Sequence, residues 1–174
     1  LATKSYADPS CDMGVILGTG TNACYPEKTD HLAKGGFARP GREMILNLEW
    51  GNFDKLITNP YDEALDLITF NPGRQRMEKM VSGMYIGELV RLILLDMTEQ
   101  GILLKEKHRP VLAREHSVSS EQMSLSCPGE DFFAAIGIPD ASDRDRDAAA
   151  HVCRIVSRRS ARIAGAALAA VVTW

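Results

Sequence analysis

The sequence predicts an α/β protein in which long helices pack on a mixed sheet. Two observations favour this class: short β-prone segments flank a glycine-rich turn within the first fifty residues, and two long helical patterns fill most of the remainder. Apolar residues make up 45% and charged residues 25% of the 174 residues, as in ordinary globular proteins. This composition excludes a mostly disordered chain, and the length is that of one domain.

The predicted strands lie in the first third of the chain. Residues 13–17 are a β-prone run that stops at the glycine-rich segment 18–22, after which a second strand begins and ends before Pro26. A strand, a glycine-rich turn and another strand predict a β-hairpin. Clusters of Pro and Gly make residues 26–43 a loop or a short edge strand, and residues 43–50 are again strand-like.

Two helices are predicted in the middle of the chain. Residues 60–70 form a short amphipathic helix. A long helix runs from Asn71 to Gln100, because Asn71 is a good N-cap and Pro72 occupies the first helical position, where its missing N–H costs nothing. Gly101 supplies the C-terminal stop. One apolar stripe of this helix comprises Met77, Met80, Val81 and Met84.

The remainder of the chain ends in a second long helix. Residues 102–130 are polar and mixed in pattern, and residues 131–138 form a short helix. Ser142 begins the last helix, and Asp145 completes a capping box three residues later. Its second half is rich in Ala and Gly, which permits close packing on a sheet or on another helix.

Charge and cysteine spacing exclude several classes of function. A net charge of −3 without a run of Lys or Arg gives no footprint for nucleic acid. The longest apolar run, about 12 residues, is too short to span a bilayer. We expect no metal site, since no metal-ligand spacing occurs among Cys11, Cys24, Cys127 and Cys153. We expect these cysteines to be free thiols in the cytoplasm. We expect the sequence to be a piece of a longer chain. It begins with Leu1, and its apolar end at 163–174 has no helix stop signal.

Three segments carry candidate chemistry. Backbone N–H groups and Thr hydroxyls at 18–22 can bind an anion, although an ordinary tight hairpin explains the same pattern. Glu49, beside Trp50 at a strand end, can accept hydrogen bonds from sugar hydroxyls, or it is simply a solvated strand end. Glu78 is also explained by the favourable dipole at a helix N-terminus. The four histidines share no motif, and three cations are interpreted as solvated charges: Lys79, Arg158 and Arg159.

Five segments are specific in combination. They are MGVILGTGTNACY (13–25), NLEWG (47–51), NPGRQRMEKM (71–80), VSGMYIGELVR (81–91) and VSRRSA (156–161). Together and in this order, they resemble the eukaryotic hexokinase family. The resemblance implies a ribonuclease-H-like fold, which is that of actin and the sugar kinases, and ATP-dependent phosphorylation of a hexose such as glucose at its 6-hydroxyl. It further implies that residues 1–174 are part of the large C-terminal domain.

The resemblance also implies roles for individual residues. Asn22, Glu49 and Glu78 match positions that bind sugar hydroxyls, and Gln75 lies close by. A carboxylate suits this task because it accepts hydroxyl donors, while an amide can both donate and accept. The positions that the resemblance places near ATP, bound with Mg²⁺, are Thr19 and Gly20 in a loop that faces the phosphates, Gly83, and further on Ser120 and Ser124.

Several parts of the family's machinery are absent from these residues. The catalytic base of the family is an Asp in an Asn-Asp-Thr motif, which we expect just before Leu1, and the small domain and the late adenosine loop are also missing. A general base must lie within reach of the attacking hydroxyl, so we expect the 174 residues alone to be inactive. The alternative is a hexokinase-like regulator that binds sugar without transferring phosphate, which the divergence at 102–150 suits.

Overall fold

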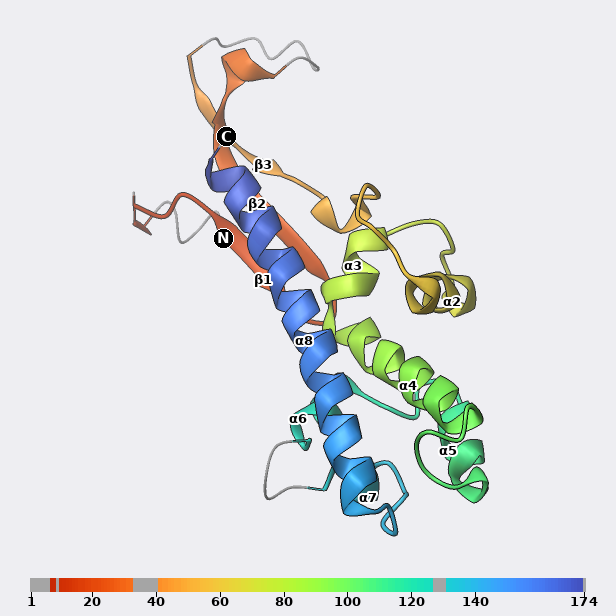
Figure 1. Cartoon of the computed structure of the whole chain (residues 1–174). Helices are drawn as coiled ribbons and strands as arrows, with labels where there is room; N and C mark the ends of the chain where they lie inside the picture. Colours follow the sequence, from red (N-terminus) through yellow and green to blue (C-terminus); the bar gives the residue numbers. More distant parts are fainter. Residues whose placement is uncertain (1–6, 9, 33–40, 127–130, 174) are drawn as a thin grey trace.

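The computed structural model describes residues 7, 8, 10–32, 41–126 and 131–173. Figure 1 shows a sheet at one end of the molecule and a group of helices at the other, with the long helix α8 (Asp143–Val172) running along both. The last turns of α8 therefore lie beside strands that are far away in the sequence. The predictions made for Leu1, Cys127 and residue 174 fall outside the described residues.

The sheet has three described strands, all antiparallel, in the order β1 (Gly14–Leu17), β2 (Thr21–Lys28) and β3 (Glu43–Asn47). The predicted hairpin is confirmed, with Leu17 opposite Thr21 across the glycine-rich turn. The predicted end before Pro26 is wrong, because β2 continues to Lys28. Beyond Cys24, β2 pairs only with β3, and a proline is tolerated where one side of a strand is unpaired. The parallel pairing expected of a mixed sheet is not seen among these strands.

The predicted helix from Asn71 to Gln100 is wrong as a single element. After α2 (Pro60–Ile68), residues 71–75 form a turn, α3 spans Arg76–Val81, and α4 spans Gly83–Glu99. Asn71 caps no helix, because the side chain of Lys79 donates to its carbonyl oxygen at 2.8 Å and holds it in the turn. Ser82 separates α3 from α4 in an extended conformation. The predicted stop is confirmed, since Gly101 has a φ of 70°.

Short helices fill the segment that the sequence describes as polar and mixed. They are η3 (Glu106–His108), α5 (Arg109–Ala113) and α6 (Ser120–Ser124). The short helix predicted within residues 131–138 is confirmed as α7 (Phe132–Ala135). The predicted capping box of α8 is confirmed, because the Ser142 side chain accepts from the backbone N–H of Asp145 and the Asp145 side chain accepts from that of Ser142. Two 3-10 turns complete the fold: η1 (Thr29–His31) and η2 (Trp50–Asn52).

Two hydrophobic clusters hold the elements together. The larger one packs α4 against α2, α5, α6, α7 and the first half of α8, and includes Leu89, Leu94 and Phe133. The smaller one contains Ala23, Trp50, Met77, Met80 and Val81, and the second half of α8 covers it with Ile163 and Leu168. This half of α8 packs on α3, another helix, and on the smaller cluster, while most of its Ala and Gly residues are exposed. Met84 leaves the predicted stripe and is 51% exposed.

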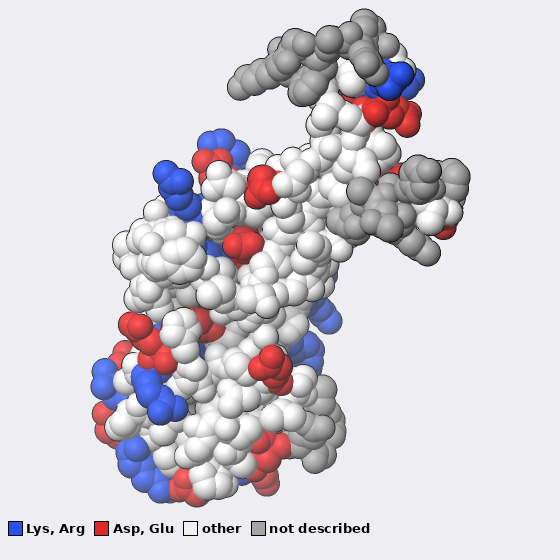
Figure 2. Space-filling view, turned by 180° about the vertical axis from the view of Figure 1, so that it is seen from behind, with Lys and Arg blue, Asp and Glu red and all other residues white. Residues whose placement is uncertain are grey.

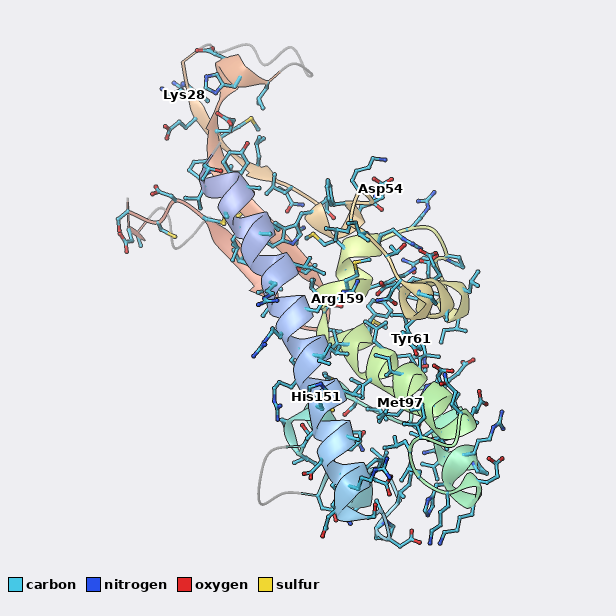
Figure 3. The ribbon with its side chains drawn as sticks, in the orientation of Figure 1. Lys28, Asp54, Tyr61, Met97, His151 and Arg159 are labelled. Atoms are coloured by element: carbon cyan, nitrogen blue, oxygen red, sulfur yellow. The ribbon has the colours of Figure 1, made fainter. Side chains whose placement is uncertain are left out.

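Two of the cations that the sequence predicts to be solvated are instead paired, which corrects both predictions. Lys79 is 3% exposed, and its Nζ donates to Asp66 Oδ1 at 2.7 Å. Burial raises the pKa of the Asp66 carboxyl, but hydrogen bonds from Lys79 and from a backbone N–H outweigh it and leave the pKa below its usual value. Arg159 reaches from α8 to α2, where its guanidinium donates to both oxygens of Asp62 at 2.7 and 2.8 Å (Figure 3). Removing one partner of such a buried pair is costly.

A third charged cluster lies at the far end of the helical region. Lys107 and His108 donate to opposite oxygens of Asp140, the histidine at 2.8 Å, and together they lower the pKa of this carboxyl to about 2. Figure 2 shows cationic and anionic side chains interspersed on the face seen from behind. In the described part of the chain, no helix is both long enough and apolar enough to cross a membrane.

Candidate functional site

The turn between β1 and β2 is held from two sides. Its residues 18–20 close on themselves, since the N–H of Gly18 donates to the carbonyl of Gly20 at 2.9 Å. The first two N–H groups of α4 donate to this turn: Gly83 to the carbonyl of Gly18 at 2.7 Å and Met84 to that of Thr19 at 3.4 Å. The turn is therefore a fixed hydrogen-bonded element between the sheet and the helices.

Asn22 and Glu49 meet on one side of this turn. Asn22 lies on β2, and Glu49 follows β3 with a left-handed φ of 50°. The Asn22 Nδ2 donates to Glu49 Oε1 at 2.9 Å, and the backbone N–H of Ala23 donates to Asn22 Oδ1 at 2.8 Å. No partner of the other carboxylate oxygen, Glu49 Oε2, is found in the described part of the chain, so this oxygen can accept a hydrogen bond from a ligand.

Glu78 and Gln75 approach the same turn from the beginning of α3. The Glu78 Oε2 accepts from the backbone N–H of Thr21 at 2.9 Å. Gln75 has a left-handed φ of 53°, and its Oε1 lies 2.9 Å from the place where a Cβ on Gly51 would stand. That Cβ would also lie 3.2 Å from the Cβ of Glu78. The predicted set is thus brought together, because Asn22, Glu49, Glu78 and Gln75 all surround Thr21 and its neighbours.

Thr21 and Trp50 give this cluster a rigid base. Trp50, 8% exposed, donates its indole N–H to Thr21 Oγ1 at 2.9 Å, and that hydroxyl donates to the carbonyl of Ile16 at 3.0 Å. Gly20 lies next to the carboxylate of Glu78, since a Cβ added there would stand 2.8 Å from Glu78 Oε2. Only glycine leaves room here for the Glu78–Thr21 hydrogen bond.

A cavity of about 670 Å³ lies on the other side of the turn. Its polar wall combines Gly18 and Thr19 of the turn with Gly83, Ser119 and Ser120. A Cβ on Gly83 would lie 3.3 Å from both the Gly18 carbonyl oxygen and Ser120 Oγ, so a side chain there would narrow the cavity. Three residues of the predicted nucleotide set, Thr19, Gly83 and Ser120, therefore share one cavity.

The other two predicted nucleotide contacts do not line this cavity. Gly20 lies against Glu78, as described above. Ser124 donates its hydroxyl to the carbonyl of Glu121 at 2.6 Å and lines a neighbouring hollow of about 430 Å³. The two hollows share Ile86 and Ser120, so Ser124 is adjacent to the cavity rather than in its wall.

The segment that ends at Ser120 is fixed by α4. A Cβ on Gly87 would stand 2.5 Å from the carbonyl oxygen of Val118, so the segment lies directly on the helix backbone. At the next residue of α4, the buried carboxylate of Glu88 is paired with Arg91 at 2.6 Å and accepts from the N–H of His116 at 2.9 Å. The sequence offers no local signal for the contacts of Gly87 with Val118 and of Glu88 with His116, since each joins residues about 30 positions apart.

Asn47 is a site residue that the sequence reasoning missed. It is the last residue of β3, and its side chain contacts both Asn22 and Glu49. The available signal is the spacing of Asn47 and Glu49, two residues apart at a strand end. In the described part of the chain, no three His, Cys, Asp or Glu side chains form a group that could hold a metal ion.

Comparisons with known proteins define the class of this fold. The structure superposes on that of a hexokinase from Schistosoma mansoni complexed with glucose, with a TM-score of 0.84 and 31% identity over 98% of this chain and 41% of that one. A second solved hexokinase matches with a TM-score of 0.77 and 31% identity, over 95% of this chain and 36% of that one. The fold is therefore that of the actin-like sugar kinases, as the sequence predicts.

Sequence comparison identifies the family. The hexokinase family model matches residues 12–174. The hexokinase HKDC1 of Mus musculus is 40% identical over 99% of this chain and 20% of its own length, and hexokinase-5 of Oryza sativa subsp. japonica is 38% identical over 97% of this chain and 36% of its length. The chain belongs to the hexokinase family. It spans about a fifth of the length of the mammalian relatives that it matches.

Proposed function

We propose that this chain is part of the large domain of a hexokinase that transfers a phosphoryl group from ATP to the 6-hydroxyl of a hexose such as glucose. Family membership and the match to a hexokinase complexed with glucose support this function. The observation that carries it is the convergence of Asn22, Glu49, Glu78 and Gln75 around one turn, from β2, the end of β3 and the beginning of α3.

The convergent side chains suit a polyhydroxylated ligand. Glu49 Oε2 is available as an acceptor, while Glu78 is fixed by its hydrogen bond to the N–H of Thr21. A sugar hydroxyl donates to such carboxylates and to an amide oxygen such as that of Asn22, and it accepts from an amide nitrogen such as that of Gln75. We therefore assign hexose binding to this side of the turn.

We assign the nucleotide to the cavity on the other side. Its wall of backbone groups and hydroxyls from Thr19, Gly83 and Ser120 suits a phosphate chain, and the lack of a side chain at Gly83 keeps the cavity from being narrowed there. Gly20 contributes by leaving room for Glu78, and Ser124 adjoins the cavity. Mg²⁺ bound with ATP neutralises charge on the transferring phosphoryl group.

The residues of this chain bind and orient the reactants rather than move the proton. The Asn-Asp-Thr motif that provides the family's base does not occur in the 174 residues, so we propose that the base and the small domain belong to other parts of a longer protein. Closure of two lobes would then exclude water from the transferring group. We propose a cytoplasmic location, which suits the free thiols of Cys11 and Cys24.

Turnover and sugar binding by the full-length protein test this function. We expect glucose and Mg-ATP to give glucose 6-phosphate and ADP, and glucose to change the fluorescence of Trp50. Glu49→Ala should raise the glucose KM at least tenfold, because a sugar hydroxyl loses a charged acceptor. Glu43→Ala, on the same strand but outside the cluster, is the control. A folded protein that binds glucose without forming product would instead be the sugar-binding regulator.

A further inference from the structure

Asn47 occupies a position that touches two members of the hexose cluster at once. It is the last residue of β3 and lies opposite Cys24 of β2. Side chains two residues apart on a strand point to the same face, so Asn22 is the diagonal neighbour of Asn47 on that face. The antiparallel register therefore brings these two amides together, and the chain then turns back to place Glu49 beside them.

The hydrogen bonds in this cluster run in one direction. The backbone N–H of Ala23 donates to Asn22 Oδ1 at 2.8 Å, which leaves the Asn22 amide nitrogen as the donor. That nitrogen donates to Asn47 Oδ1 at 3.0 Å and to Glu49 Oε1 at 2.9 Å. The Asn47 Oδ1 is occupied by this hydrogen bond from Asn22, so the amide nitrogen of Asn47 is its donor. This nitrogen donates to the same Glu49 oxygen, Oε1. The orientation of each amide is thus determined by the one before it.

The consequence for Glu49 is a fixed carboxylate. Two amide nitrogens converge on Oε1 and hold this oxygen, which leaves Oε2 as the oxygen for which no partner is found among the described residues. The backbone of Glu49 is in the left-handed region, which a non-glycine residue adopts only when its surroundings hold it there. Without Asn47, a single hydrogen bond from Asn22 would remain to orient the carboxylate.

We propose that Asn47 is a positioning residue of the hexose site, which orients Asn22 and Glu49 for the sugar hydroxyl without binding the hydroxyl itself. This inference rests on the proposed hexokinase function. It predicts that a change at Asn47 affects sugar affinity, whereas the affinity for ATP, which is assigned to the opposite side of the turn, stays constant.

Asp and Ala at position 47 separate positioning from other roles. Asn47→Ala removes both hydrogen bonds, and Asn47→Asp keeps the shape and the acceptor for Asn22 but puts a second carboxylate next to Glu49. If Asn47 positions Glu49, Asp is the more harmful change, because it cannot donate to Glu49 and repels it. If Asn47 only fills space, the isosteric Asp is the milder change. If Asn47 binds the sugar directly, Asp also remains a good acceptor for a hydroxyl.

The experiment measures glucose affinity and steady-state kinetics in the full-length protein. We expect Asn47→Ala to weaken glucose binding and raise the glucose KM about tenfold, the equivalent of one or two modest hydrogen bonds. Asn47→Asp should have the larger effect, and the ATP KM should stay within twofold in both. Glu43→Ala, at the other end of β3, should leave glucose affinity unchanged. Loss of folding would lower the active fraction without this selective change in KM.

The outcomes distinguish the two proposals. Unchanged glucose affinity in Asn47→Ala, or a milder effect of Asn47→Asp than of Asn47→Ala, overturns the role of Asn47 while the hexokinase function stands. Glucose binding is read directly from fluorescence, so a parent protein that binds glucose but forms no product still tests Asn47. A parent protein that binds no hexose overturns both proposals.

Discussion

Replacing Gly87 by alanine tests how closely the cavity wall depends on one helix. Gly87 lies within α4, and an added Cβ would stand 2.5 Å from the carbonyl oxygen of Val118 and 2.7 Å from the carbonyl carbon of Ser119. Both atoms belong to the backbone, so no side-chain rotation relieves the overlap. Restoring an ordinary contact of 3.4 Å requires a displacement of about 0.9 Å between helix and segment.

That displacement should lower the stability of the protein and move the segment that leads into the cavity wall. Forcing an extra methyl group into a well-packed site costs about 1–3 kcal/mol, and the upper part of that range applies because the clash is with backbone. The segment that must move continues into Ser120, which lines the proposed nucleotide cavity. We therefore expect a less stable full-length protein with an ATP KM raised several-fold. The glucose KM should not change, because Glu78 lies in α3 and Gln75 caps its N-terminus, and neither belongs to α4.

Thermal unfolding and steady-state kinetics measure these effects. Gly165→Ala is the matched control, because Gly165 lies in the exposed part of α8 and a Cβ there meets no atom within 4 Å. Alanine in an exposed helix is favoured over glycine by about 0.5–1 kcal/mol, so this variant should be slightly stabilised. If Gly87→Ala is as stable as Gly165→Ala and binds ATP normally, the segment is not held against α4 as described.

Three further changes have expected outcomes. Lys79→Met leaves the buried Asp66 without its closest cation and should cost about 3 kcal/mol in urea unfolding; a cost below about 1 kcal/mol would contradict the pairing. Gly20→Ala displaces the Glu78 carboxylate and should raise the glucose KM but not the ATP KM; equal effects on both would contradict its placement. The pKa of Asp140 is lowered to about 2 from an ordinary 3.8, so its stabilisation is present above pH 4 and lost toward pH 2. Asp140→Asn should therefore be less stable than the unchanged protein at pH 7, with a much smaller difference at pH 2; a difference as large at pH 2 as at pH 7 would contradict the assignment.

Local sequence signals predicted the elements whose causes are local. The β1–β2 hairpin follows from a glycine-rich turn between two β-prone runs, and it formed where predicted. The capping box of Ser142 and Asp145 satisfies helix N–H groups within four residues, so no distant contact competes with it. Gly101 stops α4 because glycine adopts the left-handed conformation easily.

The long helix could not be read correctly because distant contacts override its local pattern. Asn71 and Pro72 have the features of a helix start, but a backbone N–H in the turn donates to Asp66 and the Asn71 carbonyl accepts from Lys79. These groups belong to residues separated from the turn by several positions and only meet after α2 and α3 pack. The same packing buries Lys79, which a sequence pattern alone assigns to solvent.

In the candidate site too, the sequence indicated some residues and missed others. Glu49 and Glu78 attract attention in the sequence because each is a carboxylate beside apolar residues, and the family resemblance unites them. Asn47 escapes notice because its role depends on the register of β2 and β3, which places it diagonally from Asn22. Ser120 and Ser124 lie one turn apart on α6 and share one hollow, but only Ser120, at the end of α6 next to Gly83, also lines the cavity.

The interruption at Ser82 explains how one turn serves both reactants. In a continuous helix, the N–H of Gly83 would donate to the carbonyl four residues earlier. Because α3 ends at Val81, that N–H is released and donates to Gly18 instead, while Glu78 at the other end of α3 holds the N–H of Thr21. The β1–β2 turn is thus attached to the proposed hexose side by α3 and to the proposed nucleotide side by α4. A movement of this turn must therefore change the geometry of both sites together.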